Sequence, residues 1–191
     1  MIDIVFPKNN EEKFIEIASK LGYEKLCFVY EFKGKPQFKE IKAEFEKLRK
    51  ETRLKLALCA LCNNDIDADL IFAKAQEKLP MNFDIIIQSP NIVKWPHATY
   101  RQLKEKLIGI PFSDLLTANN RETVLAKLDR FIFLCRKYRL TFALGSYAKE
   151  PYDMRSVHDL KSFFLTLGMH PADVKSGFNS VEKLLEEKDI L

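Results

Sequence analysis

The stretch Leu140-Thr141-Phe142-Ala143-Leu144-Gly145-Ser146-Tyr147-Ala148-Lys149 opens the part of the chain that decides the fold. Its first five residues are an apolar run with the length of a buried strand, after which we expect a turn exposing Ser146 and Lys149. Further on, Ser156-Val157-His158-Asp159 has the pattern of a capping box, and Gly168 suits the left-handed residue that ends a helix. A strand, a loop and a capped helix therefore follow one another, as in a parallel α/β fold.

The same order of strand and helix repeats toward the amino terminus. Apolar runs predict strands at residues 2–6, 25–30, 54–61, 84–88 and 108–112. Amphipathic stretches predict helices between them, and the longest helix begins after Asn119 or Asn120. We expect a Gly- and Pro-punctuated loop at 32–38, and one more short helix with Pro171 in its first turn. Residues 65–79 fit either a helix or a short strand at 68–73.

Six expected strands and one ambiguous strand suit either an open doubly wound sheet or a barrel. A typical eightfold barrel has about 250 residues, so a chain of 191 residues would form a trimmed or irregular one. The length and the 47% hydrophobic content are those of one substantial core, and we expect a single domain over residues 1–191.

Charge and hydropathy limit the classes of protein to consider. The net charge of +4 and the pI near 8.8 suit an acidic partner such as RNA without demonstrating one. No apolar run approaches the roughly 20 residues that span a bilayer, and Met1-Ile2-Asp3 lacks the basic start of a signal peptide. We therefore expect a soluble, cytoplasmic protein that does not bind a membrane.

The four cysteines lie mostly inside apolar runs, as reduced core residues do in a cytosolic protein. Cys59 and Cys62 have the CxxC spacing of zinc and redox sites. They fall in or next to a predicted strand, where residues three apart point to opposite faces, and no second CxxC follows. Buried core cysteine is therefore the favoured interpretation.

Loops at the carboxyl ends of the predicted strands are rich in cations and amides, which bind phosphate oxygens. They are poor in the carboxylates and histidines that hold a metal, and the chain has only three histidines, His97, His158 and His170. Neither GxGxxG nor GxxxxGK[ST] occurs. We expect no cofactor, no metal ion and no catalytic residue in this chain.

The loop side chains predict an RNA-binding set instead. Arg155 is singled out because amides at the start of the following helix could share a phosphate with it. The expected RNA-binding residues are Arg155, Arg121, Lys149, Lys94, His97, Asn119, Lys33 and Lys35. Trp95 fits either stacking on an unpaired base or packing its own loop, and the basic face of the longest helix, Arg121 through Lys137, fits either an RNA contact or a solvated surface.

Several of these stretches resemble one family. The pattern includes residues 145–151, Met154-Arg155, Asp159-Leu160, Leu167-Gly168-Met169 and Ala172-Asp173-Val174. Upstream, residues 108–113 with Leu115, Leu116 and Asn119, and residues 135–139, extend it. The segment 84–179 resembles the barrel-type protein subunit of archaeal and eukaryotic ribonuclease P, the archaeal ribonuclease P protein component 3 family. Asp3 lies where that family often has an aspartate, whereas Ser156-Val157 stand where it usually has Gly-Pro.

This resemblance implies a TIM-like α/β barrel similar to the PHP phosphoesterases, here with seven strands and one crossover helix trimmed, so that 68–73 is a strand. It implies a subunit that binds the ribonuclease P RNA and supports removal of the 5′ leader from precursor tRNA. The RNA performs the cleavage with magnesium ions. A second small protein subunit is the other implied partner, and contact with the precursor tRNA would be indirect.

Two other functions are also to be weighed against the sequence. A free-standing PHP-like metal-dependent phosphoesterase would share the barrel but needs histidine-rich motifs at strand ends, where this chain has Asp3-Ile4-Val5-Phe6-Pro7. A barrel used purely for protein–protein assembly is compatible with the sequence.

Overall fold

The computed structural model describes residues 1–61, 66–88 and 95–190. Over this part of the chain, parallel strands form one sheet in which each strand pairs with the next along the sequence. The strands are β1 (Ile2–Val5), β2 (Lys25–Tyr30), β3 (Lys55–Leu61), β4 (Leu70–Lys74), β5 (Ile85–Ile87), β6 (Leu107–Pro111) and β7 (Thr141–Gly145). The sheet curls round until β1 and β7 meet, which makes a nearly closed seven-stranded α/β barrel of the TIM type.

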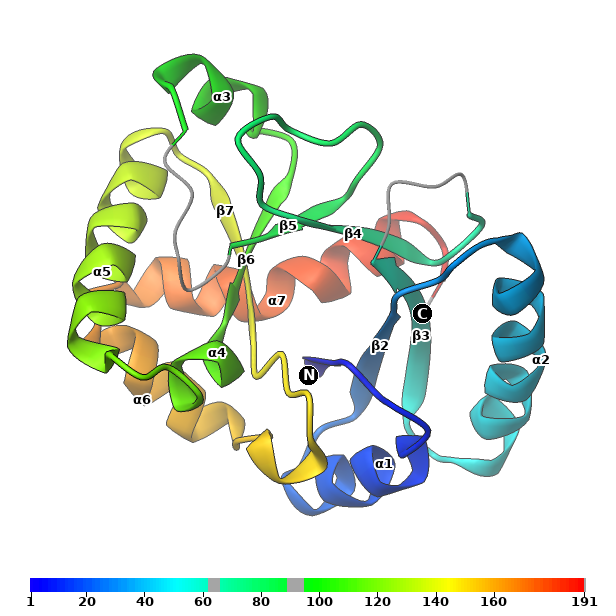
Figure 1. The fold of residues 1–191 in the computed structure, drawn as a ribbon. Helices are drawn as coiled ribbons and strands as arrows, with labels where there is room; N and C mark the ends of the chain where they lie inside the picture. Colours follow the sequence, from blue (N-terminus) through cyan, green and yellow to red (C-terminus); the bar gives the residue numbers. More distant parts are fainter. Residues whose placement is uncertain (62–65, 89–94, 191) are drawn as a thin grey trace.

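Helices surround this barrel (Figure 1). They are α1 (Glu11–Lys20), α2 (Lys35–Glu51), α3 (His97–Gln102), α4 (Phe112–Leu116), α5 (Arg121–Lys137), α6 (Val157–Thr166) and α7 (Pro171–Glu187), with a short 3-10 turn, η1, at Pro151–Asp153. None of the helices in the described part of the chain combines the length and the hydropathy of a membrane-spanning segment.

Parallel strands that are covered on both faces have continuous apolar sequences, and most residues of these strands are buried. One face of the strands fills the barrel interior, with Ile4, Cys27, Phe72 and Ile85 among its members. The other faces pack under the helices: α1 and α2 cover the first three strands, while α5, α6 and α7 cover the later ones. Burial on both faces gives the barrel its main driving force.

The seam between β1 and β7 is closed by few backbone contacts. Val5 and Ala148 form an isolated bridge, and the Phe6 amide donates to the Ala148 carbonyl at 2.8 Å. The Asp3 carboxylate completes the closure, because it accepts from the Ser146 amide and the Ser146 hydroxyl, each at 2.6 Å. A buried side chain therefore replaces part of the hydrogen-bond ladder at this seam.

Helix α7 closes the amino end of the barrel. It packs on β7, and its Val181 and Leu185 belong to the interior cluster. Lys25, at the start of β2, pairs with Glu182 of α7 at 2.6 Å, and Lys188 pairs with Asp84, just before β5, at 2.8 Å. The strand starts are thus covered, and the carboxyl ends form the open mouth of the barrel.

The structure confirms the α/β barrel and the strand in the ambiguous segment, which is β4. The connection from β4 to β5, residues 75–84, contains no helix, as the trimmed barrel predicts. The caps of two helices are confirmed as well. The Asn120 side chain accepts from the Thr123 amide, the Ser156 hydroxyl accepts from the Asp159 amide, and Gly168 has a φ of +81°.

Some expected boundaries are wrong. The predicted loop at 32–38 ends at Gly34, because Pro36 lies in the first turn of α2, where its missing N–H costs no helical hydrogen bond. Phe112 begins α4 instead of ending a strand. The short helix expected after Pro171 is the 17-residue α7, and Gly177 sits inside it.

Candidate nucleic-acid interface

A cavity of about 1120 Å³ occupies the mouth of the barrel. Its lining residues come from the carboxyl ends of all seven strands and from α2. The floor is apolar, with Phe6, Val29, Leu61, Ile87 and Tyr147. Loop side chains at the carboxyl ends of parallel strands converge here, as the topology requires.

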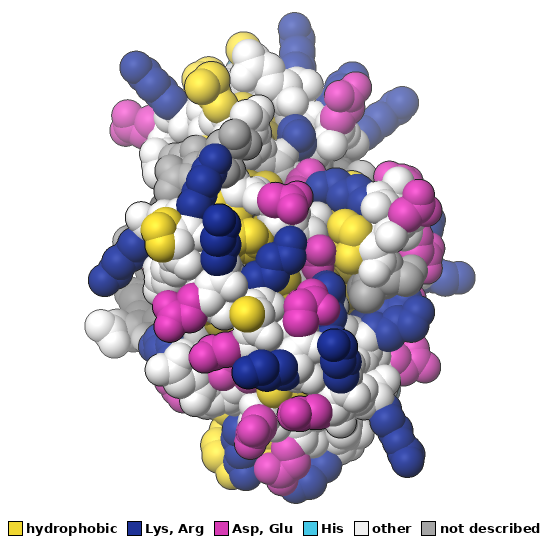
Figure 2. Space-filling view, turned by 90° about the vertical axis from the view of Figure 1, so that its right-hand side faces the viewer, with side chains coloured by type: hydrophobic (Ala, Val, Ile, Leu, Met, Phe, Trp, Pro, Cys, Tyr) yellow, Lys and Arg dark blue, Asp and Glu magenta, His cyan; other side chains and the backbone are white. Residues whose placement is uncertain are grey.

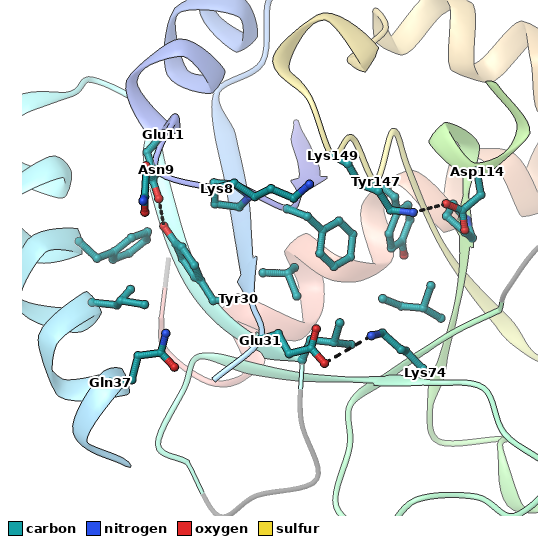
Figure 3. Close-up of a pocket in the computed structure, with 18 of the residues that line it drawn as sticks. Lys8, Asn9, Glu11, Tyr30, Glu31, Gln37, Lys74, Asp114, Tyr147 and Lys149 are labelled. Atoms are coloured by element: carbon teal, nitrogen blue, oxygen red, sulfur yellow. Dashed lines mark hydrogen bonds and ion pairs between the residues drawn. The ribbon is translucent and has the colours of Figure 1, made fainter. Parts of the chain in front are cut away.

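The rim of this cavity is polar and its charges are largely paired (Figure 3). The Lys149 ammonium lies 2.6 Å from the Asp114 carboxylate, and the Lys74 ammonium lies 3.5 Å from the Glu31 carboxylate. On the α1 side, the Tyr30 hydroxyl donates to Glu11 at 3.0 Å. Lys8 reaches a carboxylate only at 4.0 Å, in Glu150.

Among the described residues, the lining holds three lysines and four carboxylates and contains no histidine. Among the described residues, no group of three histidine, cysteine, aspartate or glutamate side chains is placed to hold a metal ion. Two of the carboxylates, Asp114 and Glu31, are bound to ammonium groups, and a third, Glu11, to a phenol. The mouth can therefore bind a polar ligand over an apolar floor.

Sequence stretches that carry the family resemblance come together beside this mouth. The Ser113 amide donates to the Ser146 carbonyl at 2.9 Å, and the Ser113 hydroxyl donates to the Tyr147 carbonyl at 2.5 Å. Tyr147 lies against Gly109 in the interior. Ser146 is fully buried, so the expectation of a turn exposing it is wrong. These residues hold the end of β7 against β6 and β1, and only Lys149 of the turn reaches solvent.

Asp3 is the one strongly perturbed carboxyl group at this seam. It is fully buried, and desolvation raises its pKa from 3.8 to about 6. Hydrogen bonds from Ser146 and from the Ile4 amide work in the opposite direction and keep the pKa from rising further. Asp3 does not line the cavity, so the shifted pKa belongs to the closure of the barrel rather than to a reacting group.

The structure brings part of the expected RNA-binding set to the mouth. Lys149 lines the cavity. Lys33 and Lys35 are exposed at the start of α2, where the Lys33 amide donates to the Gln37 side chain, which also lines the cavity. Lys94 lies outside the described residues.

The other expected residues that the structure describes do not line the cavity. The Arg155 guanidinium donates to the carbonyls of Tyr152 and Met154, each at 2.8 Å, and Arg121 donates to the Leu116 carbonyl at 3.0 Å. Asn119 is exposed before α5. His97, at the start of α3, contacts the Tyr138 hydroxyl through Nδ1. Their role in RNA binding stays a prediction.

Two rim lysines, Lys8 and Lys74, were not in the expected set. Lys8 stands three positions after the end of β1, in a loop after a strand, which is the kind of position the sequence favoured. Lys74 ends β4, and its place at the mouth was hidden because local pattern left that strand undecided. A firm assignment of β4 would have identified it.

Two alternatives are decided by burial. Trp95 is 6% exposed, donates from Nε1 to the Gln76 carbonyl at 2.7 Å and packs edge-on to Phe131, so it holds its loop down. Cys59 is fully buried in the barrel interior, and burial raises the pKa of its thiol. Cys62, its partner in the CxxC spacing, lies outside the described residues.

The surface over α2 carries both signs of charge (Figure 2). Lys and Arg side chains are spread over this face and alternate with Asp and Glu. Such a mixture is typical of a solvated surface and offers no continuous track for a phosphate backbone.

The fold and the site define a class: a seven-stranded TIM-like barrel whose amino end is closed by a helix and whose mouth lacks a metal-ligand cluster within the described residues. A solved structure has this fold. The chain is similar to one chain of the "cryo-EM structure of archaeal Ribonuclease P with mature tRNA", with a TM-score of 0.79 and 18% sequence identity, over 99% of this chain and 91% of that chain. No family model matches the sequence, and no curated protein matches it.

Proposed function

We propose that this chain is a protein subunit of ribonuclease P, which binds the catalytic RNA and supports removal of the 5′ leader from precursor tRNA. The observation that carries the proposal is the match in fold, along almost the whole of both chains, to a chain of archaeal ribonuclease P bound to mature tRNA. The segment 84–179 supports it independently, because its residues resemble that family's barrel-type subunit in sequence.

In this proposal the chain is not itself catalytic and binds no cofactor. The RNA carries out the cleavage with magnesium ions. The paired charges of the mouth and its lack of histidine support this division of labour. A PHP-like phosphoesterase, the alternative with the same barrel, would need a cluster of metal ligands.

The proposed partners are the ribonuclease P RNA and a second small protein subunit, with indirect contact to precursor tRNA. We place the protein in the cytoplasm, as one barrel domain over residues 1–191. Cationic loops near the mouth, among them Lys149, Lys33 and Lys35, would contact RNA phosphates, and Arg121, Arg155, Lys94, His97 and Asn119 would extend that contact.

Reconstitution tests the proposed function. Cognate ribonuclease P RNA should cleave precursor tRNA faster, or at lower magnesium concentration, when the full-length protein and its partner subunit are present. The protein alone should not hydrolyse a simple phosphoester with Mg²⁺ or Mn²⁺. Metal-dependent hydrolysis without RNA would favour the phosphoesterase, and cleavage that does not respond to the protein would refute the subunit proposal.

Salt dependence tests the contact by Lys149. The affinity of the chain for the RNA should fall with salt, and Lys149→Gln should reduce the slope of log K against log salt by about 0.7–0.9, because one phosphate contact is lost. Lys20→Gln is the matched control, since Lys20 is an exposed lysine paired with Glu16 on α1. Equal slopes for the two variants would remove Lys149 from the interface.

A further inference from the structure

A row of four side chains runs along the outer face of α5. The residues are Lys127, Arg130, Phe133 and Lys137, spaced three or four positions apart, so they are neighbours on the helix surface. All four are exposed, and Phe133 is 66% exposed. The buried side of α5, which contains Leu128, Phe131, Ile132 and Cys135, faces the barrel. We call these four residues the α5 row; the helix forms one side of the molecule (Figure 1).

The three cations of the α5 row have no carboxylate partner within 4 Å among residues 1–61, 66–88 and 95–190. The sequence explains why these cations lack carboxylate partners on their own helix, because no Asp or Glu stands three or four positions from any of them. Helix α1 shows the opposite design: Glu16 pairs with Lys13 at 2.9 Å and with Lys20 at 2.5 Å. On α5 itself, Arg136 lies outside the row and is paired with Asp173.

The surrounding segment is the basic part of the chain. Residues 95–140 contain nine Lys and Arg against four Asp and Glu, whereas the whole chain has 31 against 27. Helix α3 packs beside the end of the row, because His97 contacts Tyr138 and Tyr100 stacks on the same ring. Arg101 of α3 is exposed and likewise has no ion pair among the described residues. Unpaired positive charge therefore extends from α5 onto α3.

Phe133 has no packing role that explains it. It is one of the few large apolar side chains that are mainly exposed, and cations stand next to it on the helix on both sides, Arg130 before it and Lys137 after it. Aromatic rings flanked by cations suit single-stranded nucleic acid, because the ring stacks on a base while the cations bind the adjacent phosphates. A protein partner would leave three unpaired cations to desolvate around the phenyl ring unless it supplied matching carboxylates.

We propose that the α5 row is a binding surface for single-stranded RNA, in which Lys127, Arg130 and Lys137 contact phosphates and Phe133 stacks on an unpaired base. From Lys127 to Lys137 the row is about 15 Å long, since a helix rises about 1.5 Å per residue. That length accommodates several consecutive nucleotides. The inference rests on the proposed function, which supplies the RNA, and it places a contact on the outside of the barrel, away from the mouth.

Two kinds of variant test the α5 row in the full-length protein with cognate ribonuclease P RNA. Phe133→Leu should weaken binding about fivefold to a hundredfold with an unchanged salt slope, and Phe133→Tyr should bind as the unaltered chain does, because it keeps the aromatic ring. Arg130→Gln with Lys137→Gln should lower the salt slope by about 1.4–1.8. The control is Lys47→Gln with Lys50→Gln, two exposed lysines near the far end of α2 from Lys35, without ion pairs among the described residues.

The outcomes separate this inference from the proposed function. If the unaltered chain does not bind the RNA, the proposed function fails. If it binds, but both α5 variants bind with the affinity and slope of the α2 control, the α5 row is not an RNA site and the subunit proposal stands. All variants concern exposed side chains, so their melting temperatures should match that of the unaltered protein.

Discussion

Between pH 4 and pH 7, the free energy of unfolding of the unaltered protein is expected to fall by about 3 kcal/mol relative to that of Asp3→Asn. Burial raises the pKa of Asp3 to about 6 in the folded protein, whereas the unfolded chain has the ordinary value near 3.8. Between these values the folded state binds more protons than the unfolded state, so stability falls as pH rises. Below about pH 4 the contribution is fully present, and above about pH 6 it is lost.

Asparagine is the suitable replacement because it is the neutral isostere of the protonated side chain. Its Oδ1 can accept from the amides of Ile4 and Ser146, and its amide can donate to the Ser146 hydroxyl. Urea unfolding at a series of pH values should show that Asp3→Asn gains on the unaltered protein as pH rises to about 6, with no further gain above it. The two proteins must be compared at each pH because other groups also change the stability. Lys20 and Lys13 lower the pKa of Glu16 to about 2, so the contribution of Glu16 to stability rises with pH, and it is the same in both proteins. A difference that stays constant across this range would refute the raised pKa.

Gly109→Ala should destabilise the barrel by about 3 kcal/mol, the upper part of the range for overpacking a core. A Cβ at this position would lie 2.5 Å from Tyr147 Oη and 3.1 Å from its Cζ. The ring cannot retreat, since Tyr147 is fully buried and its hydroxyl donates to the Ala143 carbonyl at 2.9 Å. Thermal or urea unfolding gives the loss.

Two comparisons make this prediction specific. Gly34→Ala is the matched control, because its nearest neighbour, Pro36 Cδ, would be 3.7 Å from the new Cβ. Tyr147→Phe removes the closest atom, so Gly109→Ala should cost less in that background than in the unaltered chain. Additive losses in the double variant would show that the hydroxyl is not the source of the clash.

The sequence pattern was sufficient to predict six of the seven strands, because each is an apolar run that is buried on both faces, whereas local pattern left β4 undecided between strand and helix. The lengths of the helices were harder to predict from the sequence. Gly177 falls inside α7 and weakens the helical signal, yet a Cβ there would lie 2.7 Å from Leu144, so the glycine is needed where α7 packs closely on β7. Pro36 was interpreted as a loop residue although prolines are also common in first helical turns.

The side-chain contacts of the site were harder to predict because they join residues that are far apart in the sequence. Lys149 pairs with Asp114, 35 positions away, and Asp3 binds Ser146, 143 positions away. Loop position alone suggested free cations, and the structure shows that Lys149 and Arg155 each have partners. The cations without partners on α5 could be recognised once the face of each residue was known, since the spacing of charges along that helix is readable in the sequence.

The two ends of the barrel have unequal freedom to change. At the amino end, α7 ties the starts of several strands together through pairs such as Lys25 with Glu182 and Lys188 with Asp84. Substitutions in the loops at the other end, or on the outer faces of the helices, leave that framework in place. Different exposed chemistries can therefore be carried by the same scaffold, and the fold is shared with a structure at a TM-score of 0.79 although the two sequences are only 18% identical. For such a chain, the residues that lock the framework carry more information about the fold than the residues exposed at the mouth do.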